Sequence, residues 1–403
     1  MNQPIQIVQR PAAKSRSTSN QFDIKTAQMA RGFHTSFPEY SPTPLLPLKE
    51  LAGYLGAAEL YVKDESKRFG LNAFKVLGGS CCIGRYIAQR LNLPVSQLTY
   101  DQLTAPAVRQ QLGELTFVTA TDGNHGRGVA WTAARLGVNS VVYMPKGSAR
   151  ERLENIRALG AHAEITSWNY DDTVRFASRQ AQEHGWVLVQ DTAWSGYTEI
   201  PTWIMEGYTT LALEIVEQLG DVRPTHLFLQ AGVGAMAGAV AGFFANYYGG
   251  DCPVITVVEP HNANCLFRTA QAGDGRLHSV GGDLSTIMAG LACGEPCSIA
   301  WSVLEACAQN FLSVPDYVAA KGMRVLGSPL GGDPRIISGE SGAATAGLVA
   351  EIMENDSHIQ LRRQLKLDRD SRILCISTEG DTDRENYRKI VWDGQYPSTS
   401  QAP

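Results

Sequence analysis

Short apolar stretches alternate along the chain with longer segments in which apolar residues recur at helical spacing. The stretches at 140–145, 225–230 and 253–260 are almost uninterrupted, which is typical of strands buried on both faces of a parallel sheet. Segments such as 149–160 and 170–185 have the spacing of amphipathic helices. The alternation predicts an α/β fold with mostly parallel open sheets covered on both sides by helices.

Glycine, proline and small polar residues separate most of the predicted elements. The helix at 199–219 is expected to bend near Gly207, and 92–114 is a polar segment with no assigned element. Further strands are expected at 58–66, 161–167, 186–192 and 372–378, further helices at 48–56, 299–310 and 338–353, a loop leading into a helix at 69–91, and strand, loop and helix in turn at 115–137 and 225–248.

The charge balance excludes some classes of partner. The chain has 35 Lys and Arg against 40 Asp and Glu, a net charge of −5, and no basic cluster, so nucleic acid and anionic membranes are not expected partners. The stretch 227–250 has no charged residue, but its glycines and polar residues divide it into a strand and a helix. We therefore expect no membrane span there.

The eight cysteines show no CxxC pair and no spacing typical of a metal site. Reduced, buried thiols in a reducing compartment, and hence a cytoplasmic protein without a metal, are the favoured interpretation. A disulfide between Cys265 and Cys293 stays open, because sequence gives no geometry.

The glycine-rich segment "AGVGAMAG" (231–238) follows a predicted strand and opens a predicted helix. Backbone N–H groups at such a helix start can bind a phosphate. Glu259 ends the next strand, where a dinucleotide-binding enzyme keeps the acid that contacts the ribose. An NAD-dependent dehydrogenase and simple strand–helix packing are therefore both alternatives.

Lys75 lies among apolar residues in "FGLNAFKVLGG" (69–79), where a loop becomes a helix. Burial and the positive end of the helix both favour a neutral amine, which can form a Schiff base. The simpler interpretation is a helix lysine whose stem lies along an apolar surface.

The loop "TATDGNHGRGV" (119–129) has the small residues and following helix that suit a bound carboxylate or phosphate. Asp122 does not fit that interpretation, because an ionised side chain there would repel an anion.

Taken together, "KDESKRFGLNAFK", "TDGNHGRG", the glycine-rich segment and "STEGDTD" occur in the order found in fold type II pyridoxal-phosphate enzymes. This group includes serine and threonine dehydratases, threonine synthase and tryptophan synthase β. The sequence resembles most closely the diaminopropionate ammonia-lyase family, from about Pro42 to Gly394, through strings such as "QDTAW", "NYDDTVR", "IMAGLACGEP" and "DPRIISGESGA".

The resemblance implies that Lys75 holds pyridoxal 5'-phosphate as a Schiff base and that Asn124 contacts its phenolic oxygen. Thr378, with Ser377 as the alternative, would face the pyridine nitrogen. His125 is a candidate substrate contact, although a side chain that stabilises the loop is the simpler role. The implied phosphate cradle is Gly232, Val233, Gly234, Ala235, Met236 and Gly238, and the implied substrate contacts are Asp122, Gly123, Asn124, His125, Asp191 and Tyr197.

The reaction that the resemblance implies is α,β-elimination of ammonia from 2,3-diaminopropionate, giving pyruvate and two ammonia. Lys75 would take the α-proton of one stereoisomer, and Asp122, on the other side, that of the second. Asp191 would bind the side-chain ammonium. A serine or threonine dehydratase is the alternative within the class. The leaving group of its substrate is an uncharged hydroxyl, however, so Asp122 and Asp191 would have no positive charge to attract.

A chain of 403 residues exceeds one hydrophobic core, so two domains are expected. We predict a disordered tail at 1–25, a large cofactor-binding domain from 26–91 and 193–403, and a small domain at 92–192 that closes on the substrate. The resemblance further implies a homodimer acting on a small amino acid.

Overall fold

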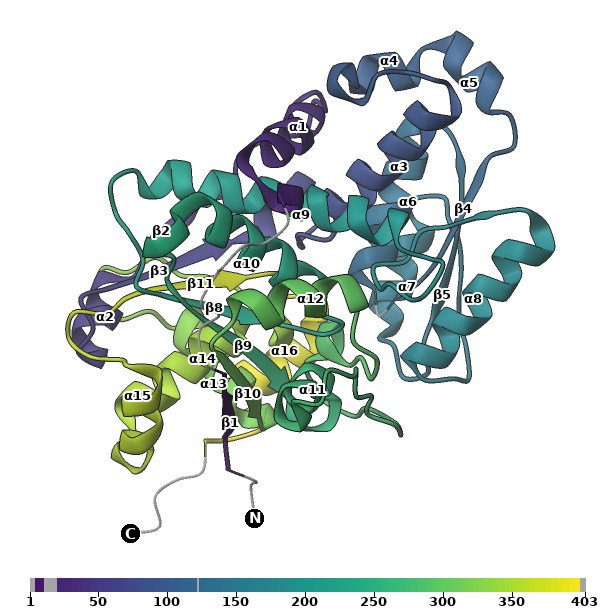
Figure 1. The fold of residues 1–403 in the computed structure, drawn as a ribbon. Helices are drawn as coiled ribbons and strands as arrows, with labels where there is room; N and C mark the ends of the chain where they lie inside the picture. The colour runs from purple at the N-terminus through teal and green to yellow at the C-terminus, as the bar shows by residue number, and fades with distance from the viewer. Residues whose placement is uncertain (1–3, 11–19, 122, 399–403) are drawn as a thin grey trace.

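The computed structural model describes residues 4–10, 20–121 and 123–398, which build two β-sheets flanked by helices (Figure 1). In these residues the larger sheet has seven strands in the order β1-β10-β9-β8-β11-β3-β2, with parallel inner strands and antiparallel edge strands β1 and β2. The smaller sheet, β6-β5-β4-β7, is entirely parallel. The predicted α/β fold is confirmed. The strands are β1 Gln6–Gln9, β2 Leu45–Pro47, β3 Glu59–Asp64, β4 Thr116–Ala120, β5 Asn139–Met144, β6 His162–Ile165, β7 Val187–Leu188, β8 His226–Gln230, β9 Val254–Pro260, β10 Asn310–Val314 and β11 Arg372–Ser377.

Helices cover both faces of the larger sheet, as the apolar strands require. Leu227 and Leu229 of β8 belong to a core that includes α9, α10 and α12, whereas Phe228 between them packs in a second core with α13 and α14. The helices are α1 Ile24–Thr35, α2 Lys49–Leu55, α3 Val76–Arg90, α4 Tyr100–Thr104, α5 Pro106–Leu112, α6 Asn124–Leu136, α7 Arg150–Arg157, α8 Tyr170–His184, α9 Glu199–Leu219, α10 Ala235–Tyr248, α11 Cys265–Ala272, α12 Ser298–Cys307, α13 Asp316–Gly327, α14 Glu340–Glu354, α15 Ile359–Leu365 and α16 Arg384–Val391.

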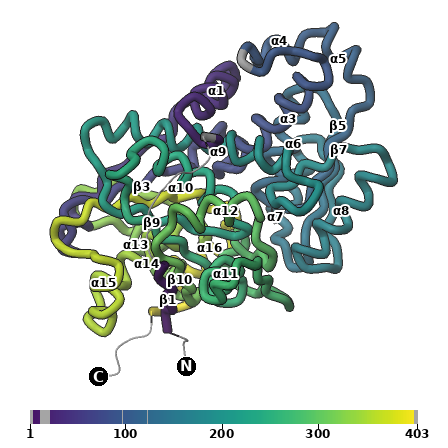
Figure 2. Tube along the Cα trace, viewed as in Figure 1, coloured from purple at the N-terminus to yellow at the C-terminus, as the bar shows by residue number. Residues whose placement is uncertain are grey.

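The smaller sheet and helices α4 to α8 lie to one side of the larger sheet, and the chain returns from them through α9 (Figure 2). Gly207 of α9 faces α3, and a side-chain carbon there would collide with the carbonyl oxygen of Leu77. Close packing of the two helices therefore explains this glycine, and α9 continues through it as one helix. The predicted division at 92–192 contains the whole smaller sheet and stays a prediction.

Residues 6–9 and 92–114 are among the segments that differ from the sequence-based expectation. Residues 6–9, expected in a disordered tail, form β1 and pair antiparallel with β10, because the open edge of the sheet offers backbone partners. The polar segment 92–114 contains the short helices α4 and α5, which begin at a capping Thr99 and at Pro106.

All eight cysteines lie in the described residues, are buried and form no disulfide, including Cys265 and Cys293. In the part of the chain that the structure describes, no helix is long and apolar enough to cross a membrane.

Candidate active site

A cavity lies where the strands of both sheets end, at the junction of the two sheets. Its wall comes from the end of β4, the loops after β7, β8 and β11, and the residues that lead into α3 and α6. Ten residues predicted from the sequence line it: Lys75, Asn124, His125, Asp191, Gly232, Val233, Gly234, Ala235, Met236 and Thr378. The fold therefore brings together segments that are distant in the sequence.

Lys75 and Asp191 form an ion pair across this cavity. Asp191 also accepts hydrogen bonds from the Tyr170 hydroxyl at 3.1 Å and the Gln190 amide at 3.3 Å. Burial alone would raise the pKa of Asp191, but the Lys75 ammonium, nearby His125 and the Tyr170 hydroxyl hold it below its usual range. Asp191 is therefore a carboxylate at neutral pH.

The glycine-rich loop forms another part of the wall. A side-chain carbon at Gly232 would lie 3.0 Å from Cys293 Sγ, and Gly234 has a φ of +98°, so both positions suit glycine. α10 begins directly after Gly234, and no side chain caps its first turn. The backbone N–H groups and the dipole of this helix start are suited to an anion.

Gly238 lies one turn further along α10 and does not line the cavity. A side-chain carbon there would lie 3.0 Å from Ala300 Cα, so this glycine lets α10 pack against α12.

Asn124 begins α6, and its amide nitrogen donates a hydrogen bond to Glu379 Oε2. Glu379 also accepts from the Ser341 N–H at 3.2 Å and from the Thr382 hydroxyl at 3.3 Å. An amide nitrogen carries two hydrogens, so Asn124 can donate to Glu379 and to a ligand oxygen at once. Asp122 lies outside the described residues. Its neighbour Gly123 has a φ of +146° and donates its N–H to Thr121 Oγ1 without lining the cavity.

Thr378 and Ser377 lie differently at the end of β11. The Thr378 hydroxyl accepts from the Gln230 amide at 3.1 Å and lines the cavity. The Ser377 hydroxyl donates to Ser338 at 2.7 Å and does not line it. This geometry favours Thr378 over Ser377 as a ligand contact.

His125 and Tyr197 both support the loops. His125 Nε2 donates to the Val189 carbonyl at 2.9 Å, which ties α6 to the end of the smaller sheet and fits the loop-stabilising role. The Tyr197 hydroxyl donates to the Leu188 carbonyl and accepts from the Gln190 N–H, both at 2.9 Å. Tyr197 does not line the cavity, so the predicted substrate contact is not seen.

The residues of the site that were not predicted include Tyr170, Gln190 and Glu379. Each lies in a distinctive string of the sequence, "NYDDTVR", "QDTAW" or "STEGDTD". These strings could have pointed to the three residues, but only the fold shows which residues of each string contact Asp191 or Asn124.

Glu259, the acid expected in a dinucleotide-binding enzyme, is fully buried and does not line the cavity. It accepts the backbone N–H groups of Leu266 at 2.9 Å and Phe267 at 2.6 Å, at the start of α11. The structure thus gives no support to an NAD-binding role.

The residues around the cavity fit pyridoxal phosphate. An amine for the aldehyde (Lys75), a glycine-lined helix start for the phosphate, and donors for the ring (Asn124 and Thr378) face one space. Among the described residues no group of three or more His, Cys, Asp or Glu is placed to bind a metal ion.

Comparison with known proteins agrees with this geometry. The family model "Pyridoxal-phosphate dependent enzyme" matches residues 37–379. The chain is 52% identical over 382 residues to the diaminopropionate ammonia-lyase of Escherichia coli K12, covering 94% of each chain, and 53% identical over 367 residues to that of Salmonella typhimurium, covering 90% of this chain and 91% of the relative. The crystal structure of holo diaminopropionate ammonia-lyase from E. coli superposes with a TM-score of 0.92 at 49% identity, covering 98% of both chains. The chain therefore belongs to the pyridoxal-phosphate dependent enzymes and, within them, to the diaminopropionate ammonia-lyase family.

Proposed function

We propose that this protein catalyses α,β-elimination of ammonia from 2,3-diaminopropionate, in both D and L forms. The observation that carries the proposal is the pairing of Lys75 with the ionised, buried Asp191 inside one cavity. An amine that can move a proton thus lies beside a carboxylate that can bind a second ammonium. The high identity to diaminopropionate ammonia-lyases along nearly the whole chain supports the same reaction.

Pyridoxal phosphate supplies the electron sink that makes the α-proton of an amino acid acidic. Lys75 would hold it covalently, the loop from Gly232 to Met236 would bind its phosphate, and Asn124 and Thr378 would contact its ring.

Lys75 Nζ would take the α-proton of one stereoisomer. Asp191 would bind the β-ammonium, which leaves as ammonia, and the carboxylate would select it over an uncharged hydroxyl. Hydrolysis of the released unsaturated product with one water gives pyruvate and the second ammonia. The N–H groups of Asn124 and His125, which line the cavity, would hold the substrate carboxylate.

The test is a substrate panel on the purified holoenzyme with D- and L-2,3-diaminopropionate, D- and L-serine, L-threonine and serine sulfate. Pyruvate, 2-oxobutyrate and ammonia are measured. D-serine belongs in the panel because one solved relative, the E. coli enzyme, is described in complex with it. We expect the highest kcat/KM for diaminopropionate and two ammonia per pyruvate. A higher kcat/KM for serine or threonine would assign the chain to the dehydratases.

Asp122 is proposed as the base for the second stereoisomer, on the sequence alone. Asp122→Asn should lower kcat/KM for D-diaminopropionate far more than for the L isomer, which serves as the internal control. Equal losses on both isomers would contradict the two-base proposal.

We also propose a homodimer that acts in the cytoplasm, with a small domain at 92–192 that closes over the substrate. Sedimentation of the holoenzyme would test the dimer, and protease protection of 92–192 on substrate binding would test the closure.

A further inference from the structure

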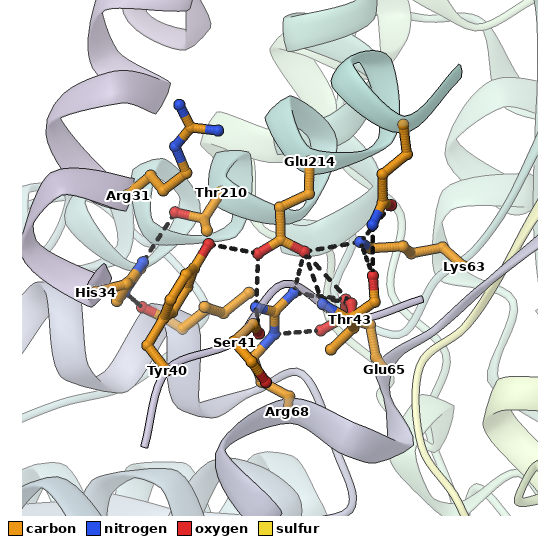
Figure 3. A network of polar contacts seen from close by, with 12 residues as sticks. Arg31, His34, Tyr40, Ser41, Thr43, Lys63, Glu65, Arg68, Thr210 and Glu214 are labelled. Carbon is orange, nitrogen blue, oxygen red and sulfur yellow. Dashed lines mark hydrogen bonds and ion pairs between the residues drawn. The ribbon is translucent and has the colours of Figure 1, made fainter. Parts of the chain in front are cut away.

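Four charged side chains form a buried network (Figure 3), and one of them, Arg68, directly precedes the loop that leads to Lys75. The Arg68 guanidinium donates two hydrogen bonds to Glu65, at 2.8 and 2.9 Å, and two to Glu214 of α9, both at 2.7 Å. Lys63 Nζ, at the end of β3, donates to Glu214 Oε2 at 2.7 Å. Two positive and two negative groups thus neutralise one another away from water.

The segment before β2 closes the network from the other side (Figure 3). The Tyr40 hydroxyl donates to Glu214 Oε1 at 2.8 Å, and the Thr43 hydroxyl donates to Glu65 Oε1 at 2.6 Å. Every carboxylate oxygen of Glu65 and Glu214 therefore accepts at least one hydrogen bond. Such a network has one geometry and resists rearrangement.

The loop after Arg68 has three residues with a backbone in the left-handed region, two of which are not glycine. Phe69 has a φ of 49°, Gly70 of 68° and Asn72 of 59°. Non-glycine residues in the left-handed region persist only when their surroundings determine them. The far end of the loop is fixed directly after β11, because Phe74 donates its N–H to the Thr378 carbonyl at 3.1 Å. The near end begins at Arg68.

We propose that Arg68 and Glu214 are positioning residues that fix the near end of this loop and thereby place Lys75 Nζ in the cavity. The inference rests on the role of Lys75 in the proposed function. It goes further in giving a function to charges that touch neither the cavity nor the substrate. The bidentate contacts of Arg68 to both carboxylates fix its orientation as well as its position, which a single contact would not.

Arg68→Met and Lys63→Met form a matched pair for the test. Each removes one positive charge from the same buried network and leaves one charge unbalanced. Lys63 lies within β3, whose backbone pairs with both β2 and β11, whereas Arg68 begins the loop. Both variants should lose thermal stability. Only Arg68→Met should also misplace Lys75.

The readouts are the dissociation constant of pyridoxal phosphate and the yield of cofactor fixed to Lys75 by borohydride, identified by peptide mass. Both are measured below the melting temperature of every variant. A small misplacement of a reacting group such as the Lys75 amine causes a large loss of its reaction with a bound partner. We therefore expect Arg68→Met to weaken cofactor binding by about tenfold or more, and Lys63→Met by about twofold at most. Arg68→Lys keeps the positive charge but cannot make the bidentate contacts of the guanidinium. Its cofactor affinity should lie between those of the wild type and Arg68→Met. It also replaces Arg68→Met in the comparison if that variant does not fold.

Equal losses of cofactor affinity and Lys75 labelling in the Arg68 and Lys63 variants would overturn the positioning role and leave the proposed function intact. Absence of cofactor at Lys75 in the wild type would overturn the proposed function and this inference with it.

Discussion

Two buried carboxylates, Glu214 and Asp191, each pair with a lysine, yet their surroundings differ. Glu214 is enclosed by Lys63 and Arg68, whose side chains are 0% exposed. Asp191 faces Lys75, whose side chain is 17% exposed and lines a cavity. Burial alone would raise both pKa values, but the partner cations lower the pKa of Glu214 to about 2 and also lower that of Asp191. The charge pairing is therefore alike, and access to a ligand distinguishes the structural pair from the pair that we propose to be catalytic.

The largest expected effect tests the structural member of this comparison. Glu214→Gln leaves an unbalanced positive charge in the network, so the free energy of unfolding should fall by about 3–5 kcal/mol. Denaturant titration measures it. Glu217→Gln on the same helix is the control, because Glu217 is half exposed in its ion pair with Arg31 and should cost less than about 1 kcal/mol. Similar losses in the two variants would mean that the network contributes no more than a surface pair.

Asp191→Asn tests the catalytic member. It should lower kcat/KM for both isomers of diaminopropionate by about 10- to 100-fold, because the amide loses the charge that attracts an ammonium. Asp172→Asn, at an exposed ion pair with Arg175, is the control and should leave the kinetics unchanged. Unchanged kinetics of Asp191→Asn itself would remove Asp191 from the mechanism.

The dependence of stability on pH provides a second test of the buried network around Glu214. His34 lies beside Arg68 and Glu214, and burial lowers its pKa from 6.5 to about 3. The unfolded chain therefore binds this proton first as the pH falls, and stability is lost below about pH 6.5. The loss should reach about 2 kcal/mol at pH 5 relative to pH 8.

The measurement is the difference in acid sensitivity between wild type and His34→Asn. This comparison removes the opposite contributions of Asp171 and Glu340, whose pKa values burial raises to about 6 and about 7. Equal pH dependence in the two proteins would show that His34 contributes nothing.

The smallest expected effect concerns Tyr197, which supports the loop that carries Asp191 but does not line the cavity. Tyr197→Phe keeps the stacking on Trp194 and removes the two hydrogen bonds of the hydroxyl. Stability should fall by about 1 kcal/mol, measured by denaturant titration. The kcat/KM should fall less than in Asp191→Asn. A kinetic loss as large as that of Asp191→Asn would restore Tyr197 as a substrate contact.

Local patterns predicted much of the fold, because apolar runs, glycine caps and helical spacing act within a few residues. The helix 48–56, for example, is α2 with Gly56 in the left-handed conformation at its end. They failed where distant segments supply the partners. β1 is a strand because β10 offers it an open edge. The sequence predicted a helix at 299–310, but the helix ends at Cys307, and the strand β10 that begins at Asn310 was not predicted.

The sequence by itself determined the α/β class, the family resemblance and the positions of Lys75, the glycine-rich loop and Asp191. These are short motifs whose residue types allow such chemistry, and the resemblance to a known family gave Lys75 and Asp191 their expected roles. Only the tertiary structure decided that Tyr170 and Gln190 donate to Asp191, that Asn124 donates to Glu379, and that Gly238 and Tyr197 do not line the cavity. Side chains meet according to how sheets and helices pack, and a linear pattern does not record that packing.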